Sequence, residues 1–399
     1  MSLVINTNVS SLNAQNNLTK SKNALAMATQ RLSSGLKINS AADNAAGFAI
    51  SQRYTTQVGG LTQASANASD AINLAQTAGS ALDQVTANLQ AIRDLAVQSA
   101  NGTYTSADRS SIDQEVQQRL AEITRIANQT TFNGSKVLDG SMQTKSFQIG
   151  ADVGQTISVN LGTSVKASDM GKIAEVNTSD LSGAFTDATG KSYTMDLSKI
   201  TVTGTDGTAV ALSGTASSVQ DLADAINAKG IAGVSAAVDG KGGLSVFSNG
   251  SFKIADTGSI NAASTLGATQ TKITGVATDV GAGAAYTDGA AVATAGSLNG
   301  SDVKTVDNAN ALISRVDVAL KTVSDFAAQL GAVQNRFQST ISTVAAQTTN
   351  LQASQSTIQD ADFASETANL SKAQVLQQAG ISVLAQANSN PQQVLKLLQ

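Results

Sequence analysis

The chain has 399 residues, a hydrophobic fraction of 41% and a formal net charge of −4 at pH 7, so it can bury a sizeable core and has no strongly basic face for nucleic acid. It contains no histidine and no cysteine, which excludes imidazole and thiolate metal sites, disulfides and Ser–His or Cys–His catalytic relays. With 3% aromatic residues and a single proline, Pro391, few rigid groups remain to line a ligand pocket. We therefore expect no enzyme, metal or cofactor.

The opening of the sequence predicts no Sec-type signal peptide. The opening MSLVINTNVSSLNAQ has neither the basic region nor the apolar region of a secretory signal peptide, and no apolar run reaches the length of a membrane span. We expect no membrane association, and export by a route other than a signal peptide stays open.

Heptad spacing predicts a first and a second helix. Leu18, Leu25 and Leu32 recur every seven residues, and Gly35 supplies a C-terminal stop. After the polar stretch of residues 38–47, apolar and small residues resume with alternating steps of four and three, which predicts a long second helix. This second seam comprises Tyr54, Val58, Leu61, Ser65, Ala68, Ile72, Ala75, Gly79, Leu82, Thr86 and Leu89.

A third helix is predicted after a break at Asn101 and Gly102, and the turn Asn133–Gly134 follows it shortly. Its apolar positions are Ile112, Val116, Leu120 and Ile123.

The C-terminal side predicts one long straight helix and a shorter final one. The long helix keeps a single register of steps of four and three through Val306, Ala309, Ile313, Val316, Leu320, Val323, Ala327, Leu330, Gln334, Phe337, Ile341, Val344, Thr348, Leu351, Gln355 and Ile358. Apolar residues at helical spacing predict the final helix over residues 370–384, with an end near Pro391.

Between these helical parts, from about residue 141 to 300, the composition changes to Gly, Thr, Ser, Ala and Asp, with period-two alternation that predicts strands. The turn at Thr205–Gly207 predicts a hairpin, residues 218–230 predict a short helix, and a second hairpin is expected to turn at residues 239–243. We therefore expect a mainly α fold with an α+β insert: long antiparallel coiled-coil helices from both chain ends and a β-rich central projecting domain.

The helical seams contain many Ala, Ser, Gln and Asn residues, which bury little apolar area. Isolated chain ends are therefore expected to be marginally stable and to gain stability from neighbouring copies. These properties are typical of a chain that assembles with other copies of itself.

Both ends of the sequence resemble bacterial flagellins. The motifs that carry the resemblance are INTNVSSLNAQNNL, QRLSSGLKINSAADNAAGFAIS, LAVQSANGTYT, TTFNGSKVLDG and FQIGADVGQTI on the N-terminal side, and NRFQSTI, IQDADFASETANLSKAQVLQQAGISVLAQAN and VLKLL on the C-terminal side. They cover about half the chain. The SVQDLADAINAKG segment with its following hairpin resembles a module that recurs in the variable insert of flagellar proteins.

The resemblance implies a structural subunit that polymerises into the extracellular filament of the bacterial flagellum and is exported unfolded through the flagellar type III channel. It implies an inner coiled-coil layer of residues 1–43 and 359–399, an outer-tube layer of residues 44–172 with a β-hairpin and of residues 304–358, and a β-rich surface insert, residues 173–303. Implied partners are copies of the same chain, an export chaperone, and cap and junction proteins.

Mapped onto these layers, the predicted seams give two sets of candidate assembly residues. The inner-layer set is Leu18, Leu25, Leu32, Leu370, Leu376, Leu384, Leu395 and Leu398. The tube-layer set is Val58, Leu61, Ile72, Leu82, Leu89, Ile313, Val316, Leu320, Phe337, Ile341 and Leu351.

Two stretches resemble flagellin segments that host innate immune receptors bind. LQAIRDLAVQ resembles the segment bound by Toll-like receptor 5, and its matching residues are Gln90, Arg93 and Leu95, together with Glu115. Ala91 stands where the family has an arginine, which removes an always-charged group with five donors. The C-terminal VLKLLQ resembles the segment read by cytosolic sensors. Helix packing alone also accounts for both stretches.

The sequence also bears on two alternatives to a filament subunit. A flagellar hook-filament junction protein has similar coiled-coil ends, but its end motifs would match less completely. An enzyme carried in the insert, such as a metalloprotease module, fails because this chain has no histidine.

Overall fold

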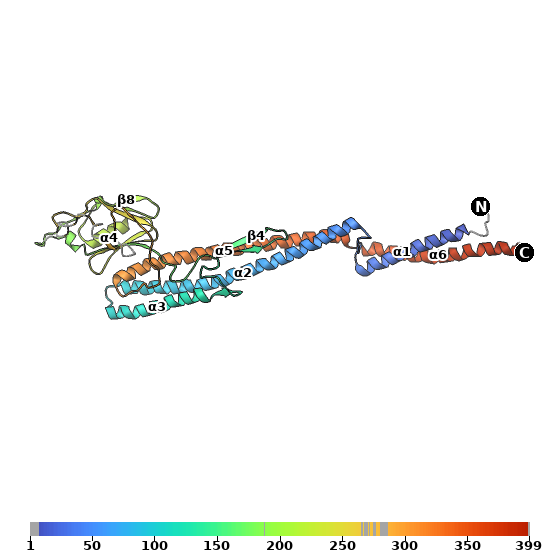
Figure 1. Ribbon diagram of the computed structural model, residues 1–399, viewed down its shortest axis with the longest axis horizontal. Coiled ribbons are helices and arrows are strands. Elements are labelled where there is room, and N and C mark those ends of the chain that lie inside the picture. The colour runs from blue at the N-terminus through green and yellow to red at the C-terminus, as the bar shows by residue number, and fades with distance from the viewer. Residues whose placement is uncertain are drawn as a thin grey trace. The chain divides into compact units, whose positions relative to one another are not determined.

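The computed structural model describes residues 8–186, 188–264, 266, 270, 272–273, 277–279 and 286–397. The chain forms two compact units. One contains the described residues of Met1–Ser69, Gln148–Thr156 and Gln338–Gln399, and the other contains Asp70–Phe147 with the described residues of Ile157–Phe337. Long N-terminal and C-terminal helices with a β-rich region between them confirm the expected fold class (Figure 1).

Three helices make up the N-terminal side: α1 (Val9–Ser34), α2 (Ala45–Ala100) and α3 (Ser106–Gln129). Helix α1 ends at the expected glycine, because Gly35 adopts a left-handed φ of 74° and its N–H donates to Arg31 O at 2.8 Å. Helix α3 begins with a reciprocal capping box between Thr105 and Asp108.

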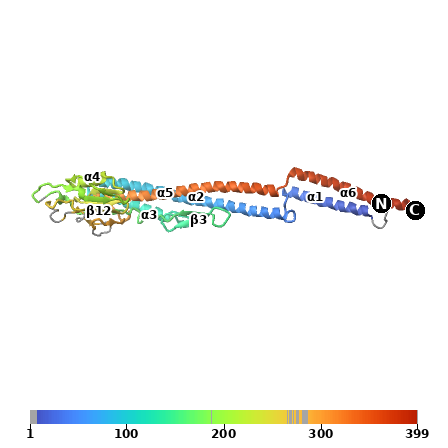
Figure 2. The ribbon, with the colours of Figure 1, turned by 90° about the horizontal axis from the view of Figure 1, so that it is seen from above.

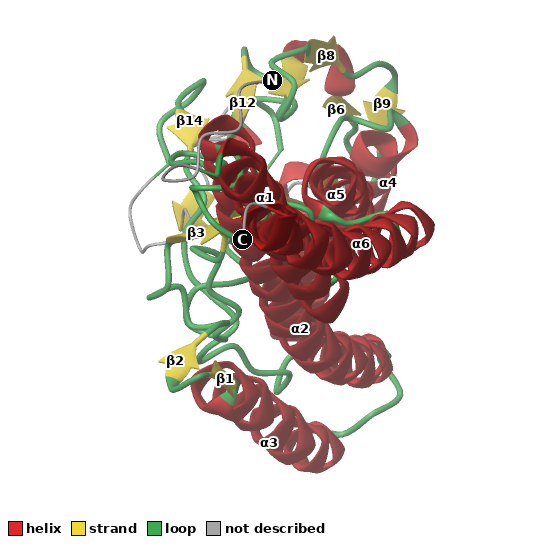
Figure 3. Cartoon of the chain, turned by 90° about the vertical axis from the view of Figure 1, so that its right-hand side faces the viewer, coloured by secondary structure: helices red, strands yellow, loops and turns green. Residues whose placement is uncertain are grey.

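Short hairpins follow α3. Strands β1 (Thr131–Phe132) and β2 (Ser135–Lys136) are joined by Asn133 and Gly134 with φ of 47° and 76°, the two left-handed residues that a tight hairpin requires. This confirms the turn expected there, and Figure 3 shows the hairpin beside α3. Strands β3 (Thr144–Gln148) and β4 (Thr156–Asn160) form a second antiparallel pair.

Helices α5 (Val306–Gln359) and α6 (Phe363–Leu397) form the C-terminal side. Helix α6 passes through Pro391, so the helix end expected near that residue is corrected to Leu397. A proline removes one donor from the helical hydrogen-bond series, at the carbonyl four residues earlier. That carbonyl, Ala387 O, accepts a bond from Asn8 Nδ2 at 2.8 Å instead, which compensates part of the loss.

The β-rich region that follows β4 and precedes α5, called the insert below, contains two antiparallel four-stranded sheets among its described residues. The first has the order β10 (Val234–Val238), β11 (Leu244–Ser248), β5 (Ala174–Thr178) and β13 (Ala277–Asp279). The second has the order β14 (Ala291–Val292), β12 (Phe252–Asp256), β7 (Ile200–Thr203) and β8 (Ala209–Ala211). A shorter pair joins β6 (Met195–Asp196) to β9 (Thr215–Ala216).

The expected local structure of the insert is confirmed. Strands β7 and β8 pair around the Thr205–Gly207 turn, β10 and β11 pair around residues 239–243, and helix α4 covers Val219–Ala228. Two single-turn 3-10 helices, Ser182–Ala184 and Leu197–Lys199, complete the described elements. A common core of buried apolar side chains joins the sheets to α4, including Met195, Val202, Leu222, Ile226, Phe252 and Ile254.

The chain enters and leaves the insert along a paired stem. Ile173 N donates to Ala295 O at 3.2 Å, and Ala295 N donates back to Ile173 O at 2.8 Å. One step further out, Leu298 N donates to Met170 O at 3.0 Å. Because both crossing segments are hydrogen-bonded to each other, the insert is attached at a narrow base.

Candidate assembly surfaces

The two ends of the chain meet along α1 and α6, which lie side by side and antiparallel (Figure 1 and Figure 2). The face between them is made of small residues: Ala14 and Ala28 on α1 and Ala373 and Ala387 on α6 are at most 8% exposed. Alanine allows close approach of the backbones but buries little apolar area. The pair alone therefore gains little free energy from burial.

Polar contacts tie α1 and α6 at both ends of their contact. Ser11 Oγ donates to Asn388 Oδ1 at 2.7 Å. Arg31 Nη1 lies 3.7 Å from Glu366 Oε1, and the Glu366 side chain is 12% exposed. Because these contacts are specific in direction, they select one antiparallel register that the small-residue face cannot select by shape.

The predicted inner-layer leucines flank this face. Leu18, Leu25, Leu32, Leu370 and Leu384 are half-buried, and Leu376 is 48% exposed. The side chain of Leu395 and all of Leu398 lie outside the described residues.

Large apolar side chains remain exposed over both helices. On α6, Phe363 is 68% exposed and Val375 65%. Burying one such side chain fully contributes about 1.5–3 kcal/mol, so these residues are candidates for contacts with other chains. Among the described side chains of α1 and α6, the exposed large apolar ones are Val9, Leu12, Met27, Phe363, Val375, Leu376, Ile381 and Val383.

A backbone bridge connects the segments that follow α1 and precede α6. Lys37 N donates to Gln359 O at 2.7 Å, and Ala361 N donates to Gly35 O at 2.9 Å. Ile38 is buried beside Gly47, where a Cβ would come within 2.5 Å of Ile38 Cδ1. The segment that connects α1 to α2 and the segment that connects α5 to α6 are thus hydrogen-bonded to each other here.

The predicted tube-layer residues all lie on buried or half-buried faces of α2 and α5. Leu61, Leu82, Leu89, Val316 and Phe337 are buried. Val58, Ile72, Ile313, Leu320, Ile341 and Leu351 are half-buried. Phe337 also makes an edge-to-face contact with Phe147 of β3, with ring centroids 5.7 Å apart.

The most buried face of each long helix differs from the predicted seam at every second position. On α2 it contains Ala71 and Ala78, whereas the sequence predicted Ile72 and Gly79. On α5 it contains Leu312 in place of the predicted Ile313. Sequence reasoning missed these positions because the neighbouring residues fit the same steps of four and three, and periodicity alone does not tell which of two adjacent small or apolar residues is buried.

The residues that resemble a receptor-binding segment lie on α2 and α3. Gln90 and Glu115 are exposed, and Leu95 is half-buried. Arg93 Nε donates to Asp317 Oδ1 of α5 at 2.7 Å, and this partner raises the pKa of Arg93. Glu115 accepts from Arg119 at 2.7 Å.

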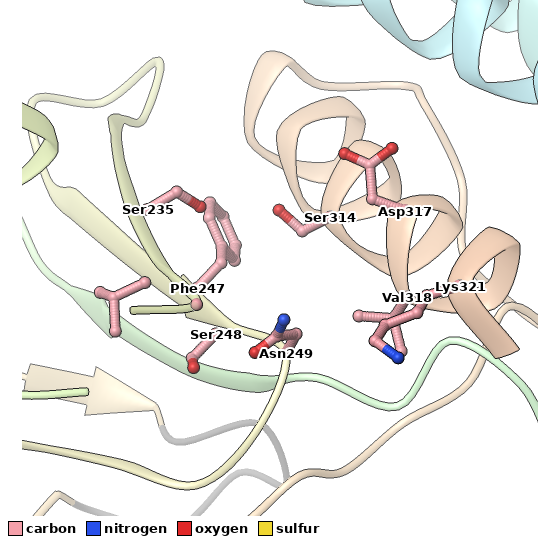
Figure 4. Close-up of a pocket in the computed structure, with 10 residues that line it drawn as sticks. Ser235, Phe247, Ser248, Asn249, Ser314, Asp317, Val318 and Lys321 are labelled. Carbon is pink, nitrogen blue, oxygen red and sulfur yellow. The ribbon is translucent and has the colours of Figure 1, made fainter. Parts of the chain in front are cut away.

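A pocket of about 230 Å³ lies between α5 and strands β10 and β11 (Figure 4). Ser235, Ser248 and Asn249 face Ser314 and Lys321 across it. Its charged side chains are engaged within the protein, since Lys321 Nζ donates to Asp325 at 2.6 Å and Asp317 binds Arg93.

In the part of the chain that the structure describes, no group of carboxylates has the arrangement of a metal site. None of the described helices combines the length and the apolar character of a membrane span.

Three family models match the chain. The model described as the bacterial flagellin N-terminal helical region matches residues 5–143, and the bacterial flagellin C-terminal helical region matches residues 313–398. The flagellin hook IN motif matches residues 199–250, which confirms the recurring module expected around α4 and its following hairpin.

Curated relatives match over their whole length. The chain is 37% identical to the B-type flagellin of Pseudomonas aeruginosa and 40% identical to flagellin D of Vibrio anguillarum, in each case over 100% of both chains. A solved structure of FliC from Burkholderia pseudomallei is 27% identical, over 67% of this chain and 99% of that one, with a TM-score of 0.39. Because flagellin family models match both terminal regions and curated flagellins match the whole chain, the chain belongs to the bacterial flagellins, the subunits of the extracellular flagellar filament.

Proposed function

We propose that this flagellin polymerises by covering the exposed apolar surface of α1 and α6 with copies of the same chain. The observation that carries the proposal is the set of large exposed side chains on α6, from Phe363 to Val383. The small-residue face between α1 and α6 gains little from burial, so contacts with neighbouring copies are needed to stabilise the pair.

In the proposed filament, residues 1–43 and 359–399 form the inner layer, residues 44–172 and 304–358 form the tube, and the insert lies outside. Repeated heterologous contacts between identical copies build an open helical polymer rather than a closed ring. The chain ends, which are only marginally stable before docking, would pass unfolded through a narrow export channel.

We propose a structural role without catalytic activity, and interactions with an export chaperone and with cap and junction proteins. The hook-filament junction protein is the less favoured reading, because relatives named flagellin match this chain over its full length.

Recognition by a host innate immune receptor is a second proposal, supported by the exposed Gln90 and Glu115. Ala91 lacks the family arginine, and Arg93 is bound to Asp317. We expect Ala91→Arg to tighten binding to Toll-like receptor 5 at least about tenfold, the effect of a good hot-spot residue. Surface-plasmon measurements on both chains test this, and unchanged affinity would count against the proposed contact.

Seeded polymerisation followed by electron microscopy tests the assembly proposal. Ile381→Glu and Val375→Glu each place a charge in the exposed apolar surface, and we expect no filaments from either. Ala211→Glu is the control, since Ala211 is exposed on β8 of the insert, and it should form filaments like the parent chain. Normal filaments from both α6 variants would refute the proposed interface.

A further inference from the structure

Asn8 makes two different hydrogen bonds with one side chain. Its Oδ1 accepts from Ser11 N at 3.0 Å, which caps the start of α1, and its Nδ2 donates to Ala387 O of α6 at 2.8 Å. The amide therefore joins the first turn of one terminal helix to the backbone of the other.

The carbonyl that accepts from Asn8, Ala387 O, lacks its usual helical donor. In an α-helix, the carbonyl of Ala387 would accept from the N–H of residue 391, and proline has no N–H. Pro391 is the single proline of the chain and lies inside α6, which continues to Leu397. Other carbonyls in the interior of α6 are paired with an N–H one turn later, so a side-chain donor gains least by binding them.

We infer that Asn8 and Pro391 together help to set the register in which the two chain ends pair, beside the contacts of Ser11 with Asn388 and of Arg31 with Glu366. A shift of α1 along α6 by one turn would take the Asn8 amide away from the carbonyl that lacks its helical donor. The small-residue face gives little resistance to such a shift, because the side chains of its buried alanines are too short to interlock across it. Since α1 and α6 are the helices that carry the exposed polymerisation surface, the inference rests on the proposed function.

Disulfide formation measures the register directly, because the chain has no cysteine of its own. A Cβ on Gly380 would lie 3.8 Å from Leu18 Cβ, which suits a disulfide. Leu18→Cys with Gly380→Cys reports the native register, and Leu18→Cys with Leu376→Cys or Leu384→Cys reports a shift of about one turn in either direction.

We expect the Leu18–Gly380 disulfide to dominate in the parent chain. Asn8→Ser keeps an N-cap and removes the amide donor, so the shifted disulfides should rise at the expense of the native one. Adding Pro391→Ala restores an N–H for Ala387 O, and Asn8→Ser should then change the disulfide yields less than twofold. Equal effects of Asn8→Ser in both backgrounds would overturn the inference.

Asn8→Asp separates the two roles of the side chain. Aspartate caps helices as well as asparagine and suits the helix N-terminus, so a capping role alone predicts no loss. The inference predicts a loss, because a carboxylate then faces the Ala387 carbonyl. Asn44→Asp is the matched control, since Asn44 Oδ1 accepts from Gly47 N at the start of α2. If both aspartate variants kept the parent register, the inference would be wrong.

Polymerisation gives an independent readout. Loss of one hydrogen bond of about 1 kcal/mol should raise the critical subunit concentration of Asn8→Ser about fivefold. Failure of the parent chain to polymerise would count against the proposed function, and the disulfide yields would still decide the register.

Discussion

The guanidinium of Arg315 lies where α5 meets the base of the insert. Its Nη2 donates to Glu175 Oε2 at 3.3 Å, and its Nη1 donates to the carbonyls of Gly171 and Ala295. Both charged side chains are only 12% exposed. Burial lowers the pKa of Arg315, and Glu175 opposes that shift, so the pair binds both crossing segments of the stem to α5.

We expect Glu175→Gln to lower the free energy of unfolding by about 2 kcal/mol, because it leaves a buried cation without its counter-charge. Asp325→Asn is the matched control. It removes an exposed ion pair with Lys321, at 2.6 Å and with both side chains more than 60% exposed, and should change stability by less than about 0.5 kcal/mol. Urea unfolding of both variants measures the difference, and equal effects would contradict the role of burial.

Acid should weaken the fold through carboxylates that accept hydrogen bonds. The Thr105 hydroxyl and backbone N–H lower the pKa of Asp108, so its ionised form is favoured in the folded chain. This contribution is present above the unfolded pKa and is lost as pH falls through the lowered folded value. The other carboxyl groups with lowered pKa are Asp43, Glu122, Asp139, Asp196, Asp206 and Asp221.

We therefore expect the melting temperature to be steady from pH 7 to about pH 5 and to fall below about pH 4. Circular dichroism melts across this range measure it. Asp108→Asn should remove part of the decline below pH 4, and a melting temperature that rises on acidification would contradict the argument.

At the scale of the elements, the sequence predicted every long helix and the two hairpins of the insert, because heptad spacing and turn residues are local signals. On α2 and α5, however, every second position of the predicted seam is one residue away from the position that is buried. Between Ala309 and Val316 the sequence offers both Leu312 and Ile313, and only packing against neighbouring helices selects Leu312. Local periodicity cannot make that choice.

For the candidate assembly surface, the sequence predicted which helices carry the residues but not the contacts that those residues make. The sequence placed Leu376 among the inner-layer assembly candidates on the terminal helices, and its exposure of 48% could not be derived from periodicity alone. The contacts of Asn8 with Ala387 and of Arg315 with Glu175 join residues far apart in the chain. Side chains of this kind give no periodic signal, so the fold is needed to find them.

Two neighbouring glycines of α2 should respond oppositely to alanine. A Cβ on Gly59 would have nothing within 4 Å, whereas a Cβ on Gly60 would lie 3.0 Å from Ala151 Cβ and 3.2 Å from its Cα. We expect Gly59→Ala to stabilise the chain by about 0.5–1 kcal/mol, the usual helical gain. Gly60→Ala should show no gain or a loss, since the turn between β3 and β4 must move. Urea unfolding tests both, and equal gains would refute the contact.

At the scale of the whole molecule, removing residues 359–399 takes away α6 and leaves α1 without its partner. We expect seeded polymerisation of this truncated chain to give no filaments in electron micrographs, while α5 and the insert keep their folded signal by circular dichroism. Long filaments from the truncated chain would mean that the tube helices suffice for assembly.

The hydrogen-bonded stem at Ile173 and Ala295 has a consequence for how this chain tolerates change. Beyond the stem, the insert contacts α5 through Glu175 and Ser245, which bind Arg315 and Asp307. The entropy of closing a loop rises only slowly with its length, so sequence of the insert that makes no contact with α5 can be gained, lost or exchanged with little effect on the helices. The insert can therefore vary in sequence while the assembly helices of the same polypeptide stay unchanged.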